Sequence, residues 1–199
     1  MNNHNVDHLT TLLEGAQDEY FGEAVTQLEH ALQCAHLARE AGADEEMVTA
    51  ALLHDIGHLI AEGGEIGTPD HDRAGAAYLS QVGFGERVVQ LVSGHVEAKR
   101  YLTATNPDYC DRLSEASKQT LAQQGGPMSQ AEAEAFEADP LFVEKLRLRS
   151  WDERAKMPGW TGDGLSYYRP ILERHLGHNV RPESSRLPSV ISFKRLLGR

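Results

Sequence analysis

Long apolar runs, cysteines and basic residues are all scarce in this sequence of 199 residues. No stretch approaches the roughly 18 consecutive apolar residues that a membrane-spanning helix needs, and the first twenty residues lack the apolar segment of a secretory signal. Only Cys34 and Cys110 are present, which is too few for a disulfide framework, so we expect both thiols to be reduced. These absences predict a cytoplasmic protein without a membrane partner.

The shortage of basic residues also argues against nucleic acid as a partner. The formal net charge of −11 would repel phosphate backbones and anionic lipids. We therefore expect a small-molecule partner, and the sequence favours no particular oligomeric state. With 40% hydrophobic residues the chain can bury a sizeable core, and we expect one domain over residues 1–178. The basic tail, residues 179–199, is expected to be a flexible extension or a remnant of cloning.

Alternating strand patterns are absent beyond a few residues, whereas apolar residues recur at intervals of three and four. This periodicity predicts an all-α fold, a single helical bundle. Asp44 is a suitable N-cap, Ser129 and Glu132 form a capping-box pattern, and glycines such as Gly83 end helices. The expected helices cover residues 23–41, 45–55, 71–82, 86–103, 113–123, a short segment after Ser129, 141–156 and 165–176.

Residues 50–60, AALLHDIGHLI, place His54 and Asp55 side by side in an otherwise apolar run. His30, His71 and His95 likewise fall on or at the ends of expected helices, with apolar neighbours one turn away. A single histidine of this kind is commonly an ordinary core or surface residue. Four of them with Asp55 need a common partner, because burying several ionisable groups is costly. A metal centre in the core of the bundle supplies such a partner.

Imidazoles and carboxylates bind first-row divalent ions, and one carboxylate can bridge two of them. Asp55, adjacent to His54, is suitably placed for that role. We expect Asp152 in RLRSWDERAK to complete the set, because Leu148, four residues earlier, has a core-facing position. His36 lies six residues after His30, on another helix face, and is left out. Ligand type alone is compatible with iron, manganese or cobalt.

The resulting pattern, H…HD…D, resembles that of the HD-domain metalloproteins, and His71 with His95 resembles their six-ligand form, which holds two metals. By itself the HD pattern is typical of phosphohydrolases that act on nucleotides. A larger set of segments is similar to the mixed-valent di-iron HD oxygenases that cleave carbon–phosphorus bonds, and the similarity extends over about residues 12–178. These segments are YFGEAVTQLEH, LLHDIGH, SGHVEAKRYL, LSEASKQTL, QGGPM and LRSWDE.

The resemblance implies an Fe(II)/Fe(III) pair with O2 as co-substrate. One iron would be held by the four ligands His30, His54, Asp55 and Asp152, and the other by His71 and His95, with Asp55 bridging the two. A hydroxyphosphonate would be oxidised at C1 and its C–P bond broken, giving phosphate and a carboxylate. The metals carry this chemistry, and the protein supplies ligands and orientation.

Two cations are expected to lie beside the metal ligands. Lys99 follows His95 by four residues and Arg149 precedes Asp152 by three, so each shares a helix face with a ligand. A dianionic phosphonate needs such fixed positive charge. Composition alone would make each a solvated surface charge.

Other residues are assigned with alternatives left open. His58, one turn after His54, would donate to the phosphonate, support a ligand, or be a surface histidine at a helix end. By resemblance, Ser117 and Thr120 contact the phosphonate, whereas by themselves they are ordinary helix-surface residues.

The segment around Tyr20 and Glu23 acts as a lid in the family. The tyrosine occupies an iron position until substrate arrives, and the glutamate suits a cationic substrate end. A capping glutamate beside a packed tyrosine is the alternative. Both residues are therefore candidate catalytic residues, together with His58 and Lys99.

The sequence does not decide whether the amine of the substrate is trimethylated or primary. A trimethylammonium group cannot donate hydrogen bonds and suits aromatic faces. Phe21, inside the lid segment, favours 1-hydroxy-2-(trimethylammonio)ethylphosphonate, which yields glycine betaine, over the primary amine, which yields glycine. Further candidates that spacing does not tie to the site are Tyr20, Tyr101, Trp160, Tyr167 and, for charge, Asp70.

Two rival classes remain. An HD phosphohydrolase would use the same ligands with a metal-activated water and would not need O2. A non-enzymatic metal-binding module would offer no reason for Lys99 and Arg149 to flank the ligands.

Overall fold

A computed structural model describes residues 2–20, 22–60 and 70–176 of the chain. Phe21 and the tail 179–199 lie outside these residues, as do Thr68 and Pro69, where the proline suits the start of the helix expected over residues 71–82. The described part is all-α, as expected, with an isolated β-bridge between Glu19 and Thr26. Its helices are α1 (Asn2–Glu14), α2 (Gln27–Glu40), α3 (Glu45–Leu53), α4 (Ile56–Ile60), α5 (His71–Val82), α6 (Glu86–Ser93), α7 (His95–Thr105), α8 (Pro107–Arg112), α9 (Glu115–Gln123), α10 (Gln130–Glu137), α11 (Phe142–Arg154) and α12 (Leu165–Leu176).

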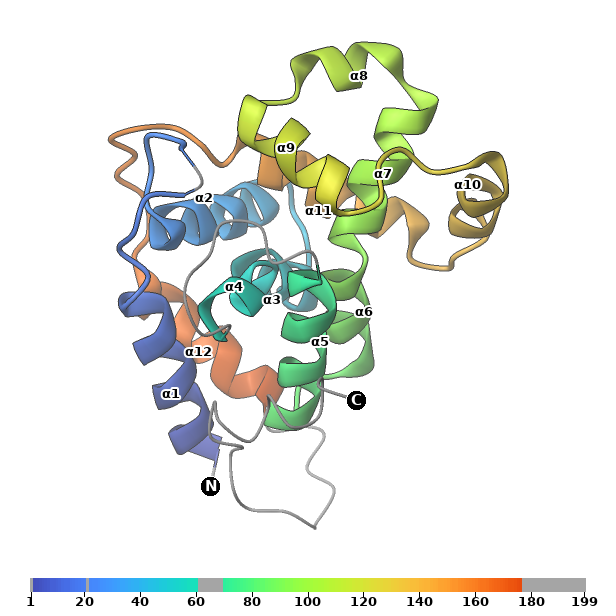
Figure 1. Ribbon diagram of the computed structural model, residues 1–199. Helices are drawn as coiled ribbons and strands as arrows, with labels where there is room; N and C mark the ends of the chain where they lie inside the picture. The colour runs from blue at the N-terminus through green and yellow to red at the C-terminus, as the bar shows by residue number, and fades with distance from the viewer. Residues whose placement is uncertain (1, 21, 61–69, 177–199) are drawn as a thin grey trace.

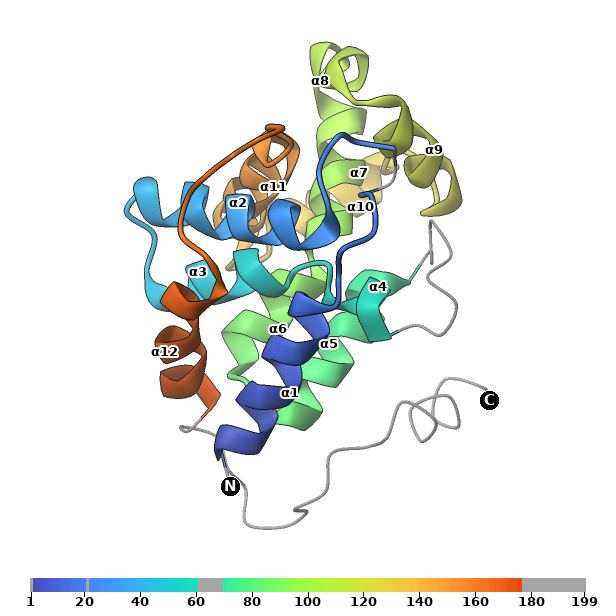
Figure 2. The ribbon, with the colours of Figure 1, turned by 90° about the vertical axis from the view of Figure 1, so that its left-hand side faces the viewer.

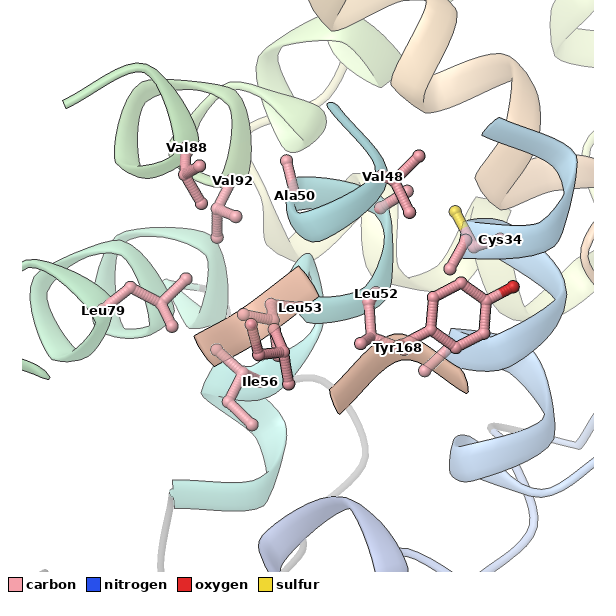
Figure 3. Close-up of a cluster of buried hydrophobic side chains, with 14 of the residues drawn as sticks. Cys34, Val48, Ala50, Leu52, Leu53, Ile56, Leu79, Val88, Val92 and Tyr168 are labelled. Carbon is pink, nitrogen blue, oxygen red and sulfur yellow. The ribbon is translucent and has the colours of Figure 1, made fainter. Parts of the chain in front are cut away.

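Helix α3 lies in the middle of the bundle. It packs against α2, α6, α11 and α12, while α5 packs against α4 and α6 (Figures 1 and 2). Every residue of α3 from Met47 to Leu53 is buried, which is why its sequence is apolar on all sides. Figure 3 shows core side chains from five helices gathered in this region, namely Cys34, Leu52, Leu79, Val92 and Tyr168.

A second, smaller core joins α7, α8 and α9. Tyr109, Leu113 and Leu121 are buried together, with Leu102 packed against them. Figure 1 shows α8 and α9 above the main bundle, at the end of the molecule opposite α1 and α12. Helix α7 therefore contributes to a separate packing unit outside the central core.

Several expected helix boundaries were wrong. The helix expected from residue 23 begins at Gln27, because Thr26 and Glu29 form a capping box. The single helix expected over residues 86–103 is divided at Gly94, and the helix expected from residue 113 begins after the N-cap Ser114. Likewise the helix expected to reach residue 55 ends at Leu53. The short α4 and α8, and the N-terminal α1, were not expected.

In the described part of the chain, no helix combines the length and the apolar character that crossing a membrane requires. Cys34 and Cys110 are both free thiols, as expected. The cytoplasmic location stays a prediction.

Candidate metal centre

The imidazoles and carboxylates expected to bind metal come together from separate parts of the fold. His30 lies on α2 and Asp152 on α11, whereas His54 and Asp55 lie between α3 and α4. The remaining two histidines each begin a helix, α5 or α7. Five of the six side chains are buried, and Asp55 is partly exposed; the set is His30, His54, Asp55, His71, His95 and Asp152.

One group of donor atoms surrounds the Nε2 atoms of His30 and His54, which lie 3.1 Å apart. Asp152 Oδ1 is 3.4 Å from the first and 3.8 Å from the second. Asp55 Oδ2 lies 3.7 Å from His30 Nε2 and 3.3 Å from His54 Nε2. The donor atoms of His30, His54 and Asp55 lie close enough together to hold one metal ion, and Asp152 Oδ1 lies beside the two histidines.

A second group shares Asp55 with the first. His71 Nε2 and His95 Nε2 lie 2.8 Å apart, and Asp55 Oδ1 is 3.4 Å from each. The two oxygens of Asp55 therefore face different histidine pairs. This is the geometry in which one carboxylate can bridge two metal ions.

The backbone fixes which imidazole nitrogen faces the centre. Nδ1 of His54 lies 2.8 Å from the Ala51 carbonyl oxygen, and Nδ1 of His95 lies 2.7 Å from that of Val92. Both carbonyls belong to the last turn of a helix, where carbonyl groups lack intrahelical partners. A carbonyl oxygen only accepts, so Nδ1 carries a proton and Nε2 is the nitrogen available to a metal. His30 Nδ1 makes the same contact with Ala155 O at 2.9 Å.

The two carboxylates are held ionised. Burial opposes this, but the Arg149 guanidinium and His30 keep the pKa of Asp152 well below its usual value. Burial likewise opposes ionisation of Asp55, whose pKa is held well below its usual value by His54 and the other imidazoles around it. Anionic oxygens and inward-facing imidazole lone pairs fit first-row transition metal ions. The residues therefore fit a metal cofactor.

Tyr20 covers one side of this centre. Its hydroxyl donates to Asp55 Oδ2 at 2.9 Å, and its ring stacks on that of His30 with centroids 3.8 Å apart. Burial and the Asp55 carboxylate raise the pKa of the phenol, which stays protonated and donates. The turn that carries it is closed by a hydrogen bond from Tyr20 N to Val25 O.

Lys156 anchors the same turn from the other side. Its ammonium donates to Glu23 Oε1 at 2.7 Å and to the N-cap Ser114 Oγ at 3.1 Å. Partial burial opposes ionisation, but Lys156 and Ser114 lower the pKa of Glu23. The contact joins the Tyr20 turn to the start of α9.

A pocket opens onto the metal ligands and contains about 420 Å³ not filled by protein atoms, including its mouth. Three cationic side chains line it, Lys99, Arg149 and Lys156. Lys99 Nζ donates to Thr120 Oγ1 at 2.9 Å, and the remaining polar lining comes mainly from α9. A pocket of this size with a cationic wall suits a small anion bound against the metals.

Lys99 and His58, which also line the pocket, both have lowered pKa values. Burial, reinforced by the Arg149 charge, lowers the pKa of Lys99 to about 7. Burial and the neighbouring His71 lower that of His58 to about 3, so its imidazole is neutral at physiological pH. The His58 ring stacks on His71 with centroids 3.9 Å apart.

A comparison with protein families matches residues 28–139 to the HD domain. The chain belongs to the HD-domain family. Among similar proteins, an uncharacterised protein of Acanthamoeba polyphaga mimivirus is 40% identical over 184 residues, 88% of this chain and 84% of the relative.

Two further relatives of this HD-domain protein bear functional names. Hydroxymethylphosphonate dioxygenase of Gimesia maris is 41% identical over 182 residues, 87% of this chain and 90% of the relative. The [1-hydroxy-2-(trimethylamino)ethyl]phosphonate dioxygenase (glycine-betaine-forming) of Leisingera caerulea is 41% identical over 169 residues, 80% and 86% of the two chains. The resemblance to the HD oxygenases that cleave C–P bonds is thereby confirmed.

Most residues expected at this HD-domain site lie in it. The pocket lining includes the expected side chains of Tyr20, His58, Lys99, Ser117, Thr120 and Arg149 beside metal ligands. Glu23 does not line the pocket and instead pairs with Lys156. His58 lies on α4, so it does not share a helix with His54 as its spacing suggested.

Sequence reasoning missed two polar lining residues, Lys156 and Gln124, and two apolar ones, Val96 and Ala116. Gln124 follows Thr120 by four residues, so the helix-face argument used for Lys99 would have found it. Lys156 lies beyond the end of α11, where no helix-face argument applies.

The aromatic side chains considered for a trimethylammonium group lie mostly elsewhere. Tyr101 donates to Glu137, and Trp160 packs against His36. Tyr167 lies under the Arg39 guanidinium, and Asp70 is exposed at the start of α5. Tyr20 alone of these candidates lines the pocket among the described residues.

Proposed function

We propose that this HD-domain protein is a di-iron dioxygenase that cleaves the C–P bond of a 1-hydroxyphosphonate, as part of organophosphonate catabolism. The observation that carries the proposal is the cationic wall of Lys99, Arg149 and Lys156, placed over two imidazole pairs that share Asp55. The names of the Gimesia maris and Leisingera caerulea relatives agree with it.

The proposed reaction balances without an external reductant. A hydroxyphosphonate R–CH(OH)–PO₃H₂ and one O2 give R–COOH and H₃PO₄, so that O2 takes all the electrons that C1 and the broken bond release. An Fe(II)/Fe(III) pair, when bound, would supply the redox chemistry with O2. The imidazole and carboxylate ligands of the two donor groups would hold it.

The protein would orient the phosphonate by charge. Lys99 and Arg149 lie on α7 and α11, the helices that also carry His95 and Asp152. A dianion bound between them would place its adjacent C1 hydroxyl toward the metal ligands. Ser117 and Thr120 would donate further hydrogen bonds from α9, and the neutral His58 would do so from α4.

Tyr20 and Glu23 would control access to the centre. The Tyr20 hydroxyl lies on the shared Asp55 carboxylate, so a substrate that approaches the metals there must displace it. Glu23 would exchange its Lys156 contact for the cationic end of the substrate. Such an exchange would favour substrates that carry both an anionic and a cationic group.

The substrate we propose first is (1R)-1-hydroxy-2-(trimethylammonio)ethylphosphonate, which would yield glycine betaine and phosphate. The Tyr20 ring in the pocket offers one aromatic face for its trimethylammonium group, and the name of the Leisingera caerulea relative includes this compound class. The unmethylated (1R)-2-amino-1-hydroxyethylphosphonate, which would yield glycine, is the alternative.

Phosphorus NMR tests the proposal directly. Iron-loaded, partly oxidised protein is incubated under air or argon with each of the two amine compounds, with hydroxymethylphosphonate, or with a nucleotide monoester. Phosphate released from a hydroxyphosphonate only under air supports the oxygenase and names its substrate. Phosphate released only from the monoester, and equally under argon, would instead identify a metal-dependent HD phosphohydrolase.

A further inference from the structure

Arg149 is the most constrained of the three pocket cations. Its side chain is buried, 4% exposed, on α11. One terminal nitrogen donates to Oδ2 of Asp152, while Oδ1 of the same carboxylate faces the His30 imidazole. Its Nε donates to the Tyr109 hydroxyl at 3.0 Å and to Glu153 Oε1 at 2.8 Å. The guanidinium is thus held from two sides, one of them a metal-centre carboxylate.

Tyr109 and Glu153 form one unit around Nε. The Tyr109 hydroxyl accepts from Arg149 and donates to Glu153 Oε1, so each of the three side chains contacts the other two. Neither Tyr109 nor Glu153 lines the pocket. They therefore act on the pocket through Arg149 rather than by touching a bound molecule.

Tyr109 also belongs to the small core of α7, α8 and α9. Its ring is buried with Leu113 and Leu121, 5% of the residue being exposed. Helix α9 carries Thr120, which accepts from Lys99. Tyr109 therefore connects the small core, whose helices carry Thr120 and Lys99, with α11, which carries Arg149 and Asp152.

We propose that Tyr109, together with Glu153, is a positioning residue. It holds the guanidinium of Arg149 in the orientation that binds an anion, and it fixes the position of Arg149 relative to Lys99 across the pocket. The proposal rests on the proposed function in that the anion is taken to be a phosphonate. A hydroxyl that both accepts and donates fixes the rotation of a planar guanidinium, which has its donors in a rigid fork. Without the Tyr109 hydroxyl, Arg149 keeps its hydrogen bonds to Asp152 and Glu153 but loses its connection to α8.

The test compares Tyr109→Phe with Tyr101→Phe in the full-length iron-loaded protein. Both substitutions remove a tyrosine hydroxyl that donates to a glutamate, but Tyr101 bonds Glu137 at an exposed site outside the pocket. Calorimetric titration with inorganic phosphate under argon measures anion affinity without turnover. Steady-state kinetics with the hydroxyphosphonate then separate KM from kcat.

We expect Tyr109→Phe to weaken phosphate binding about tenfold, in keeping with the loss of a hydrogen bond to a charged group, and to raise KM by a similar factor. Tyr101→Phe should match the wild type in both. Unchanged phosphate affinity in Tyr109→Phe, or equal losses in both variants, would overturn the proposal. Glu153→Gln, which keeps the Tyr109 ring in place, provides the same test if Tyr109→Phe does not fold, and we expect the same direction.

The two hypotheses fail separately. Suppose that the wild type releases no phosphate from hydroxyphosphonates, and that Tyr109→Phe loses phosphate affinity while Tyr101→Phe does not. The proposed reaction is then wrong and the positioning role stands. If the wild type is active and Tyr109→Phe has the same phosphate affinity and KM, the positioning role is wrong and the reaction stands.

Discussion

Gly57 approaches His71 so closely that a Cβ atom added to Gly57 would lie 1.9 Å from the His71 carbonyl oxygen. The contact joins α4 to the first residue of α5. Because only a residue without a side chain fits such an approach, the glycine of HDIGH sets where His71 lies. The motif thus supplies two ligand residues, His54 and Asp55, and leaves the space in which a third, His71, lies.

Gly57→Ala should therefore displace His71 and weaken metal binding by the donor group that His71 forms with His95 and Asp55. Overpacking of this kind costs about 1–3 kcal/mol, so the melting temperature should fall together with the metal content. Gly164→Ala is the matched control, since a Cβ there meets no atom within 4 Å. Metal analysis and thermal unfolding of both variants check the prediction, and a Gly57→Ala protein with normal metal content would contradict it.

Asp55 is expected to be the ligand that both metal ions share. Its two oxygens face different imidazole pairs, so Asp55→Ala should lower the bound iron from about two ions per chain to one or none and reduce turnover by more than about 100-fold. Asp163→Ala, which removes a carboxylate that pairs with Arg39 and His36 outside the metal centre, should change neither value. Two irons per chain with normal turnover in Asp55→Ala would refute the bridging role.

Lys99 should make anion binding depend on pH. Its pKa of about 7 means that the ammonium is charged below pH 7 and loses its charge as the pH rises. KM for the hydroxyphosphonate should consequently increase above pH 7, by up to about tenfold per pH unit. Lys99→Arg stays protonated throughout, and the ionisation of the substrate is common to both proteins. The ratio of the two KM values, measured from pH 6 to 9, isolates the Lys99 effect; a constant ratio would exclude it.

The Lys156–Glu23 ion pair should hold the turn that carries Tyr20. Both side chains are largely buried, with relative exposures of 16% and 20%, so the pair should contribute about 1 kcal/mol. Lys156→Met and Glu23→Gln, alone and combined, form a double-mutant cycle in the free energy of unfolding. Coupling near zero would show that the turn is held by its backbone hydrogen bonds alone.

Much of the site could be predicted from the sequence because metal ligands are ionisable groups in apolar surroundings. His54 and Asp55 are conspicuous inside AALLHDIGHLI, and Lys99 and Arg149 follow from helix periodicity next to a ligand. The structure brings all of these side chains together. Their roles as ligands and anion contacts remain to be measured.

The features that were missed depend on information that periodicity does not contain. Gly94 divides a helix whose apolar pattern continues across it, and this break lets His95 reach Val92 O. Lys156 lies in irregular backbone after α11, where the direction of a side chain follows from tertiary contacts. Helix α1 was not predicted, although Val6, Leu9 and Leu13 have helical spacing and are buried.

The most direct test of the account is the ratio of O2 consumed to phosphate released. An oxygen electrode and phosphorus NMR are applied to the same reaction of iron-loaded protein with 1-hydroxy-2-(trimethylammonio)ethylphosphonate and, in parallel, with the other hydroxyphosphonates. The account predicts one O2 per phosphate for at least one of them and no release under argon. Phosphate release without O2 consumption, or from a phosphate ester alone, would contradict it.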